Sequence, residues 1–330
     1  MAQKLLTFSV ASYNIEKYLD KLMTSVVCDE TKDRIEVLIV NDGSKDRTAE
    51  MARAYEEKYP DTVRLVDKEN GGHGSTINRG MQEAQGKYFR ALDGDDWVDT
   101  AALIQLLDRL ETLESDMICM DFSKCFEGGG DERITFPQLV DGKTYAFDEV
   151  AEAIRFMYYH SVIYRTAFLQ EHKIRLQEKC FYVDTEFMLY PIPHVQTLTY
   201  LALPLYCYRI GINEQSVSAA GRIKHIADSD RVAHNLLTFG SGLSAELSKE
   251  KRDYILRGFA LNFEFHVKSL LMFPSCKERK RELVTFDREI KAACPEAYDL
   301  MNRSKVIRLL RRSRYLAYRL MSAYVKKHNG

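Results

Sequence analysis

The chain has 330 residues, of which 45% are hydrophobic and 29% charged, and its formal net charge is −1. This composition is typical of a soluble globular protein, and the length suits one large core or two lobes. The near-neutral charge argues against a nucleic-acid partner, and no run of about 18 apolar residues offers a membrane-spanning helix.

Short apolar runs and amphipathic stretches alternate through the first third of the chain. We predict strands at 5–11, 35–42, 63–68, 87–93 and 115–126, and helices at 14–28, 44–59, 75–85 and 100–113. Runs as apolar as IEVLIVND are usually covered on both faces. The alternating order predicts an α/β fold, with a mostly parallel, Rossmann-like sheet and helices on both of its faces.

The rest of the chain follows a glycine-rich break, EGGGDE, at 127–132. The middle mixes a helix predicted at 147–160 with a strand at 197–210, and the periodicity is helical from about residue 222 to the end. We therefore expect three segments: 1–130, 131–221 and a helical C-terminal extension, 222–330.

Residues 302–330 form a basic tail, with nine lysines or arginines and no aspartate or glutamate. Its apolar residues recur at helical spacing: Val306, Leu309, Leu310, Leu316, Leu320 and Tyr324. Such a helix either lies on an anionic membrane surface or packs on its own domain with a solvated basic face. The sequence leaves both interpretations open.

The opening sequence and the cysteines indicate where the protein works. MAQKLLTFSVASYN has one lysine and a short apolar run, which is not typical of a secretory signal. The seven cysteines are odd in number and include no Cys-x-x-Cys pair. We expect reduced, mostly packed thiols in a cytoplasmic protein, which is either free or peripheral at the inner face of the membrane.

Polar residues follow four predicted strands at the point where each strand ends. Tyr13 and Asn14 follow the first strand, Asp42 ends the second, and Asp93 ends the fourth. The glycine-rich stretch ENGGHGST, at 69–76, follows the third. In open α/β sheets, ligands bind beyond the carboxyl ends of the strands. The sequence therefore predicts one ligand site at this edge of the sheet.

Three carboxylates lie close together after the fourth strand: Asp93, Asp95 and Asp96. Like charges this close repel one another, and a cation relieves the repulsion. Asp-x-Asp oxygens suit Mg²⁺ or Mn²⁺, which also take substrate phosphates as ligands. The sequence has no Gly-x-x-x-x-Gly-Lys-Ser/Thr loop, and NGGHG does not match Gly-x-Gly-x-x-Gly. We expect a divalent cation with a diphosphate beside it.

These motifs resemble those of glycosyltransferase family 2, the inverting enzymes with the GT-A fold. The resemblance runs through SYNIEKYLDKLMTSV, VLIVNDGSKDRT, ENGGHGSTINRG and YFRALDGDDWVD, and more loosely through IRLQEKCFYVDTEF and YCYRIGINEQSVS. It covers about two thirds of the chain and leaves out the helical region after residue 222. It implies that a sugar moves from a nucleoside-diphosphate sugar, most often a UDP-sugar, to a hydroxyl of a glycan, lipid-linked or protein acceptor. Surface polysaccharide or glycan synthesis is the process implied.

The resemblance also implies roles for single residues in the donor-binding half. Tyr13 would stack on the base, and Asp42 would accept a hydrogen bond from it. Asp93 would contact the ribose or the metal, and Asp95 would ligate Mn²⁺ or Mg²⁺. Asp96 would face the sugar or order the loop. The further donor contacts implied are Asn14, Gly72, Asn78 and Arg209.

The catalytic base implied by the family is the aspartate of a Glu-Asp pair. Asp184, in FYVDTEF, stands at that position and would take the proton of the acceptor hydroxyl. The residue before it is Val183, and a nearby carboxylate is found only at Glu186. The base therefore lacks the usual acidic neighbour.

The phosphate contacts also depart from the family pattern. Ile77 stands where the family has an arginine, so that Arg79 or Arg90 replaces it at a phosphate, or neither does. In the late loop, Arg209 and Ser216 resemble the residues that close over the diphosphate. Arg209 is alternatively part of a surface ion pair.

Two other functions remain open. A nucleotidyltransferase uses a similar sheet and metal, but VASYNIEKY lacks the glycine-rich turn and arginine that it would need after the first strand. A non-catalytic nucleotide- or glycan-binding scaffold is suggested by Val183 and Ile77.

His73 either contacts a substrate or is solvated, and Trp97 either stacks on a sugar or anchors its loop. His160, in the aromatic run FMYYH, is expected to be structural.

Overall fold

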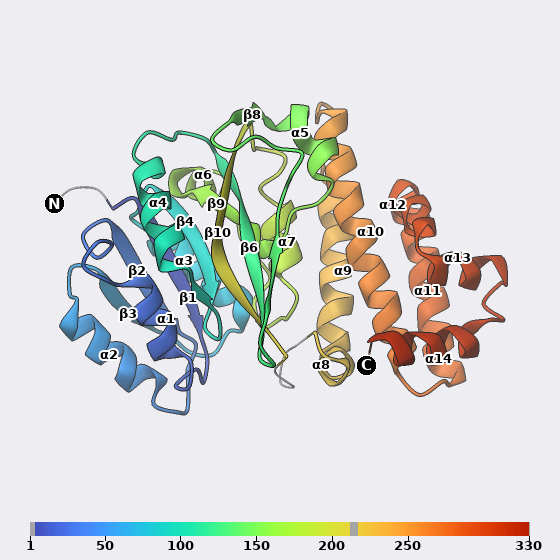
Figure 1. The fold of residues 1–330 in the computed structure, drawn as a ribbon. Coiled ribbons are helices and arrows are strands. Elements are labelled where there is room, and N and C mark those ends of the chain that lie inside the picture. Colours follow the sequence, from blue (N-terminus) through green and yellow to red (C-terminus); the bar gives the residue numbers. More distant parts are fainter. Residues whose placement is uncertain (1–3, 212–216, 330) are drawn as a thin grey trace. The chain divides into compact units, whose positions relative to one another are not determined.

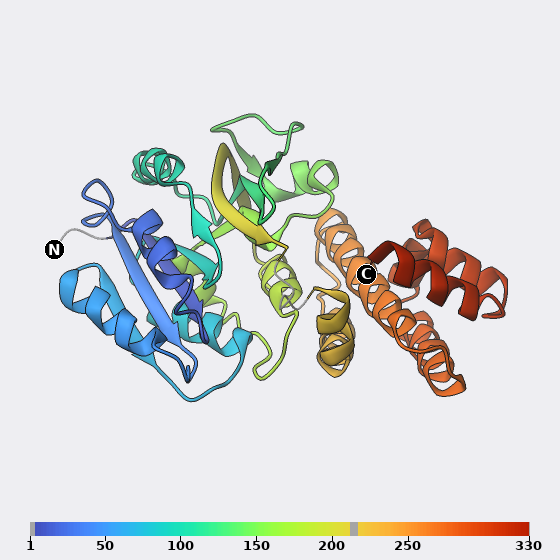
Figure 2. The same cartoon turned by 60° about the horizontal axis from the view of Figure 1, so that its bottom comes forward.

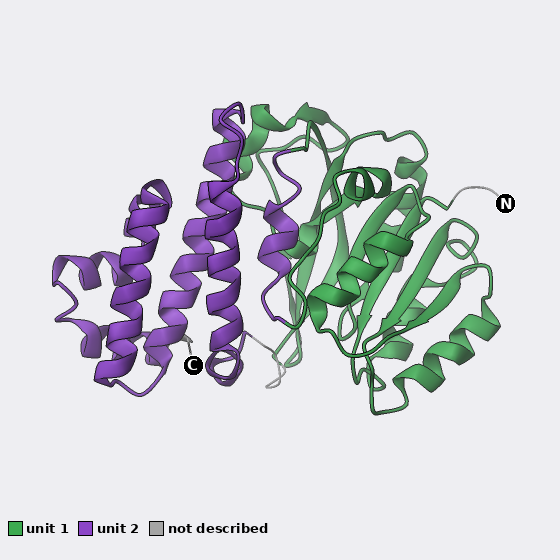
Figure 3. Ribbon diagram, turned by 180° about the vertical axis from the view of Figure 1, so that it is seen from behind, with its two compact units in different colours: residues 1–179, 194–212 green, residues 180–193, 213–330 purple. Residues whose placement is uncertain are grey.

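The computed structural model describes residues 4–211 and 217–329, which form two compact units (Figure 3). Unit 1 comprises residues 1–179 and 194–212, and unit 2 comprises residues 180–193 and 213–330. Unit 1 contains the sheet, and unit 2 is helical (Figure 1).

Unit 1 is built on one mixed sheet, whose main strands run in the order β3-β2-β1-β4-β9-β6-β10-β5. Strands β1 to β4 pair in parallel, and β6 pairs in parallel with β10. The strands are β1 Leu6–Ser12, β2 Ile35–Asn41, β3 Val63–Asp67, β4 Tyr88–Asp93, β5 Trp97–Val98, β6 Met117–Phe126, β7 Asp131–Ile134, β8 Thr144–Ala146, β9 Val162–Arg165 and β10 Thr197–Ile210.

The five strands predicted in the first third are confirmed as β1, β2, β3, β4 and β6. Every residue of β2 is buried, as expected for a strand with both faces covered. Strand β9, which the sequence reasoning missed, inserts antiparallel between β4 and β6. Strands β5, β7 and β8 also pair antiparallel, so the sheet is mixed as a whole.

Helices cover both faces of this sheet. Helices α1 Leu19–Val26, α2 Thr48–Lys58 and α4 Thr100–Leu110 lie on one face, and α3 His73–Glu83 and α6 Thr166–Glu171 lie on the other (Figures 1 and 2). The core of the first face joins Val26 and Leu103 to Phe8 and Ile39 of the sheet. Helix α5, Phe147–Ile154, is shorter than the predicted 147–160, because Arg155 takes φ 54° and ends it before the short 3₁₀ helix η1, Tyr159–Ser161.

Unit 2 is a helical assembly centred on α10, which contacts α7, α8, α9, α11, α12 and α14. Its elements are α7 Asp184–Leu189, α8 Ala219–Lys224, α9 Ile226–Ser241, α10 Lys249–Met272, α11 Lys277–Ala293, α12 Pro295–Leu300, η2 Met301–Arg303, α13 Lys305–Arg312 and α14 Tyr318–Asn329. The predicted helical extension is confirmed.

The basic tail is two helices rather than one, because Arg314 and Tyr315 take φ 49° and 61° and break it. Among the described residues, no helix has both the length and the hydrophobicity needed to cross a bilayer.

Candidate active site

The carboxyl ends of β1, β2, β3 and β4 meet at one edge of the sheet in unit 1. In the parallel ladders, Ala11 pairs with Asp93 and Ser12 pairs with Asn41. The loops that follow these strands therefore converge, as the sequence predicts. Tyr13 stands at this edge with 51% of its surface exposed, so its ring is accessible to a ligand.

Asn14 joins the loop after β1 to the loop after β2. Its backbone N–H donates to Ser44 Oγ at 3.0 Å, and its side-chain oxygen accepts from the Lys45 N–H at 2.8 Å. Asn14 adopts φ 55°, a left-handed conformation that asparagine tolerates better than most residues. These bonds fix the position of the neighbouring Tyr13, and a contact of Asn14 with a nucleotide stays a prediction.

Asp42 is buried and organises the glycine-rich loop after β3. Its carboxylate accepts hydrogen bonds from Lys68 Nζ at 2.5 Å and from the N–H groups of Gly71 and Gly72, each at 2.8 Å. Gly72 precedes α3 with φ 78°, a conformation that favours glycine. Asp42 thus holds the loop against the end of β2. Its predicted contact with a base, and that of Gly72 with the donor, are not tested by this geometry.

Asp93 ends β4 and is held by aromatic neighbours. Its Oδ1 lies 2.9 Å from His73 Nε2 and accepts from the Tyr159 hydroxyl at 3.3 Å. Burial acts to raise the pKa of Asp93, but the charge and hydrogen bond of His73, with the hydrogen bond of Tyr159, outweigh it and hold the pKa below its ordinary value. His73, at the start of α3, therefore contacts the acidic turn, residues 93–96, and is not merely a solvated residue.

Asp95 is partly exposed, and its ionised form is disfavoured by its surroundings. Burial, and then the charge of Asp93, raise the pKa of Asp95 to about 6. Its backbone carbonyl accepts from Arg209 Nε at 2.8 Å, but no other side chain of the described residues donates to its carboxylate. Asp95 is thus a carboxylate with free coordinating capacity beside a like charge.

Asp96 is buried and ties the acidic turn to β10. One oxygen accepts from the Tyr206 hydroxyl at 2.6 Å, and the other accepts from the Arg209 N–H at 2.7 Å. Burial and the charges of Asp95 and Asp93 raise the pKa of Asp96 well above its usual range. Asp96 therefore orders the loop, and a contact with the sugar stays a prediction.

Arg209 and Trp97 pack together beside the turn. The Arg209 guanidinium lies 4.9 Å from the ring centres of Trp97 and of Tyr18, and Lys21 Nζ lies 3.1 Å from the Trp97 centre. The distance from Arg209 to Glu127 is 3.6 Å, a looser contact than its bond to the Asp95 carbonyl. Arg209, on β10, therefore contacts the acidic turn, and Trp97 packs against its guanidinium. A stacking contact of Trp97 with a sugar stays a prediction. Ser216 lies outside the described residues.

Sequence reasoning missed the support that lies behind Asp93. The guanidinium of buried Arg90 donates to the carbonyls of Tyr159, His160 and Val162, which fixes the segment that leads into β9. His160 stacks on Tyr208 at 4.1 Å, and burial lowers the pKa of His160 to about 3, so this imidazole is neutral. Only the antiparallel insertion of β9 brings these residues to Asp93, and no motif signalled it.

The two arginines considered as replacements for Ile77 are both engaged elsewhere. Arg90 is committed to backbone carbonyls, and Arg79 pairs with Glu83 one turn further along α3. Ile77 itself is buried in the core. Arg90 is therefore not available to a phosphate, whereas the Arg79 side chain is 48% exposed, so its contact with a phosphate stays a prediction.

The acidic turn has a donor set that suits Mg²⁺ or Mn²⁺. Ligand atoms of Asp93, Asp96 and His160 lie within 4.8 Å of one another. This group does not include Asp95, so ligation by Asp95 stays a prediction. His160 Nδ1 is buried and has no hydrogen-bond partner among the described residues. The pKa values of Asp95 and Asp96 are raised in part by carboxylate repulsion, which a cation removes. These residues fit a divalent cation, and an imidazole ligand suits Mn²⁺ better than Mg²⁺.

The predicted base lies in unit 2. Asp184 is exposed at the start of α7, directly after the buried Val183. Glu186 is fully buried, and one of its oxygens accepts from Asn235 Nδ2 at 2.9 Å. Glu186 is therefore part of the packing of unit 2. The role of Asp184 as base stays a prediction.

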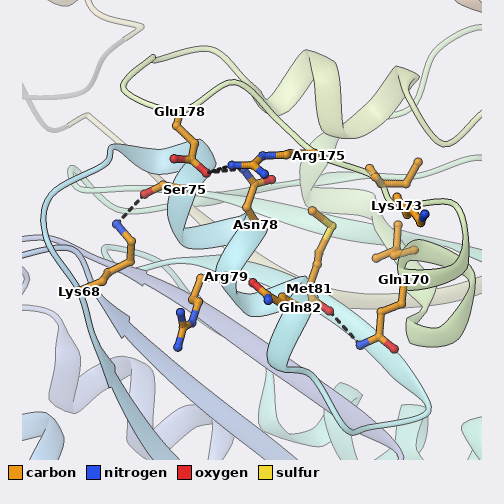
Figure 4. Close-up of a pocket in the computed structure, with 12 residues that line it drawn as sticks. Lys68, Ser75, Asn78, Arg79, Met81, Gln82, Gln170, Lys173, Arg175 and Glu178 are labelled. Atoms are coloured by element: carbon orange, nitrogen blue, oxygen red, sulfur yellow. Dashed lines mark hydrogen bonds and ion pairs between the residues drawn. The ribbon is translucent and has the colours of Figure 1, made fainter.

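A groove of about 560 Å³ lies on the α3 and α6 side of unit 1 (Figure 4). Lys68 and Ser75 line it and also belong to the Asp42 network, with 2.8 Å between Nζ and Oγ. Asn78 exchanges hydrogen bonds with the backbone of Leu176 at 2.8 and 2.9 Å, and it also donates to Glu178. Asn78 thus secures the wall of the groove, and its contact with a nucleotide stays a prediction.

Known proteins share both the sequence pattern and the fold. Residues 7–173, half of the chain, match the profile described as Glycosyl transferase family 2. The uncharacterized glycosyltransferase EpsJ of Bacillus subtilis strain 168 is 28% identical over 220 residues, which cover 62% of this chain and 61% of EpsJ. The poly(ribitol-phosphate) β-N-acetylglucosaminyltransferase TarS of Staphylococcus aureus Mu50 is 24% identical over 308 residues, covering 92% of this chain and 52% of TarS. The chain thus spans only about half to three fifths of the length of these relatives.

Solved structures agree on the fold. The crystal structure of S. aureus TarS 1–349 with UDP-GlcNAc superposes with a TM-score of 0.70 at 19% identity, covering 98% of this chain and 92% of that one. A mannosyltransferase from Pyrobaculum calidifontis, in complex with GDP-Man and Mn²⁺, gives a TM-score of 0.55 at 14% identity, covering 98% and 87%. The predicted GT-A fold with a helical C-terminal region is confirmed. The chain belongs to glycosyl transferase family 2.

Proposed function

We propose that this protein transfers one sugar from a UDP-sugar to an acceptor hydroxyl, with inversion at the sugar carbon. The observation that carries the proposal is the convergence of Tyr13, Asp42 and the acidic turn at one sheet edge, in a chain of family 2. The UDP-GlcNAc complex of TarS supports a UDP-sugar as donor. Relatives named as a teichoic acid poly(glycerol phosphate) polymerase and as a poly(ribitol-phosphate) β-N-acetylglucosaminyltransferase support surface polysaccharide or glycan synthesis as the process.

We assign donor binding to residues at the ends of the strands, which belong to the proposed donor-binding half, residues 1–130. The exposed Tyr13 ring stacks on the base, while Asp42 shapes the loop that carries Gly72. A Mg²⁺ or Mn²⁺ ion held by Asp93 and Asp95 would neutralise the charge of the leaving diphosphate. Arg209 adds positive charge next to the turn, because its guanidinium is fixed to the Asp95 carbonyl.

The acceptor is activated by a base on the face of the sugar opposite the diphosphate. Asp184 takes the proton of the acceptor hydroxyl, and the oxygen then attacks the sugar carbon in line with the leaving group. Attack from that face inverts the configuration. We assign the acceptor and base to the segment 131–221, and the acceptor is a hydroxyl on a glycan, a lipid-linked sugar or a protein.

We place the reaction in the cytoplasm. All seven cysteines are free, and five of them are buried, which supports the expectation of reduced, packed thiols. A nucleotidyltransferase is not supported, because the family of the chain is one of glycosyl transferases.

The proposal is tested by measuring UDP release from a set of UDP-sugars, with Mn²⁺ and with a chelator. We expect Mn²⁺-dependent release with at least one donor, and loss of at least about a hundredfold in Asp95→Asn, since one electrostatic contact of this kind is worth 10² to 10³ in rate. Asp61→Asn, an exposed aspartate with the same charge change, should retain wild-type release. If nucleotide binds but no donor is turned over, the chain is a binding scaffold and the proposal fails.

A further inference from the structure

The last two helices of unit 2 are held firmly on their inner side. Val306 and Leu310 of α13 and Met321 and Val325 of α14 are buried. The Ser322 hydroxyl donates to the carbonyl of Leu271 in α10 at 2.7 Å. The basic tail is therefore packed on its domain, and what remains to be explained is its outer side.

The turn between the two helices is anchored to a buried carboxylate. Asp287 of α11 is 3% exposed, and Arg311 Nη2 donates to it at 2.7 Å. The Tyr315 hydroxyl also donates to Asp287. Arg314 and Tyr315 both adopt left-handed backbone, which costs non-glycine residues of order 1 kcal/mol or more each. A strained turn pinned this way has one clear effect: it directs the next residue, Leu316, into solvent.

Three large exposed apolar side chains recur at four-residue spacing from the turn before α14 into that helix. Leu316, in the turn, is 83% exposed, and on α14 Leu320 is 64% exposed and Tyr324 is 48% exposed. Leu320 and Tyr324 lie four residues apart and therefore on one face of α14, and we call the three side chains the apolar ridge. The residues of α14 that are buried lie on the opposite side.

Positive charge surrounds the apolar ridge. Lys327 lies one helical turn from Tyr324 on the same side of α14, and the exposed Arg319 neighbours Leu320 in the sequence. Of the nine basic residues in the tail, Arg311 alone is paired among the described residues. The other eight are exposed and have no carboxylate partner within the described chain: Arg303, Lys305, Arg308, Arg312, Arg314, Arg319, Lys326 and Lys327.

We propose that the apolar ridge and its basic neighbours form a docking surface for an anionic lipid bilayer. The ridge would enter the headgroup boundary, while the long lysine and arginine side chains reach the lipid phosphates. Lipid offers both an apolar phase and negative charge, whereas a nucleic acid offers only the charge. α13 and α14 lie at the edge of unit 2 (Figures 1 and 2), and the side chains of the ridge are exposed. The surface acts independently of sugar transfer.

Vesicle flotation of the full chain tests this docking surface. We expect binding to phosphatidylcholine vesicles that contain phosphatidylglycerol, little binding to phosphatidylcholine alone, and weakening by salt. Leu316→Ser with Leu320→Ser should weaken binding at least about tenfold, because each leucine contributes apolar burial. Leu261→Ser, an apolar residue 51% exposed on α10, is the matched control and should bind like the wild type.

The charge requirement is tested in parallel. Arg319→Gln with Lys327→Gln should lose most of the binding, while Arg281→Gln with Arg288→Gln, an equal charge change on exposed sites of α11, should not. Unchanged thermal unfolding shows that each variant is folded. The proposal is overturned if the ridge variant still binds anionic vesicles, if neutral vesicles bind equally well, or if the ridge proves to be covered in a dimer that the ridge variant disrupts.

Discussion

The raised pKa of Asp95 means that the electrostatics of the acidic turn can be tested by measuring the stability of the folded protein. Its pKa is about 6 in the folded chain, because of burial and the charge of Asp93, against about 3.9 in an unfolded chain. Above pH 6 the folded state therefore holds an unfavourable ionised carboxylate. Below about pH 4 the carboxyl is protonated in both states and the cost disappears. The metal-free protein should thus lose stability from this group as the pH rises from 4 to 6.

Asp95→Asn should accordingly stabilise the metal-free protein. We expect a gain of about 1 to 3 kcal/mol at pH 7.5, because two pKa units correspond to at most about 3 kcal/mol. The gain should vanish near pH 4, and thermal unfolding at both pH values measures it. Asp61→Asn serves as the control, and an Asp95→Asn protein less stable than the wild type at pH 7.5 would contradict this view of the turn.

At the scale of elements, β4 and the segment before β9 act as one support. Arg90 of β4 is 2% exposed and donates to three carbonyls of that segment, which presents Tyr159 and His160 to Asp93. Lysine has the charge but lacks the planar fork, so it cannot make the same set of bonds. The geometry of Asp93 thus depends on a buried residue that acts through its neighbours.

Arg90→Lys should therefore loosen this segment. We expect a loss of about 2 to 4 kcal/mol in the free energy of unfolding, from two or more charge-assisted hydrogen bonds, and faster amide exchange around 156–162. Arg79→Lys, on the exposed side of α3, should change either quantity little. Wild-type exchange in Arg90→Lys would show that the segment is held by its apolar contacts instead.

The same elements show which parts of the fold and of the site could be predicted from the sequence. Strands β1 to β4 and the loops at their ends were predictable, because long buried apolar runs alternate with amphipathic helices and each run stops at a polar residue. Asp42 and Asp93 were found by that rule. Strand β9 has only four residues, too few for a periodic signal, so the approach of His160 to Asp93 stayed hidden. The breaks at Arg155 and Tyr315 rest on left-handed backbone that no glycine marks.

At the scale of the whole molecule, two predicted site elements fall in different units. The acidic turn belongs to unit 1, and Asp184 belongs to unit 2. Binding of donor and removal of the acceptor proton should therefore be separable by mutation. The segment 131–221 contributes to both units, since the boundaries fall at residues 179 and 193 and again after 212.

Asp184→Asn should separate the two steps. We expect the affinity for UDP with Mn²⁺ to stay within about twofold, while kcat falls by about 10² to 10⁴, the usual contribution of a general base. Calorimetry and UDP release measure the two quantities, and Asp299→Asn, an exposed aspartate of α12, is the control. Wild-type kcat in Asp184→Asn would assign the base to another residue.

The central claim is that the acidic turn and a nucleoside diphosphate share one divalent cation. The most direct test is the affinity for UDP, measured by calorimetry with and without Mn²⁺, in the wild type and in Asp95→Asn. We predict that Mn²⁺ strengthens UDP binding to the wild type at least about tenfold, or about 1.4 kcal/mol, and that Asp95→Asn abolishes this gain. Equal UDP affinity with and without Mn²⁺, or a full Mn²⁺ effect in Asp95→Asn, would contradict it.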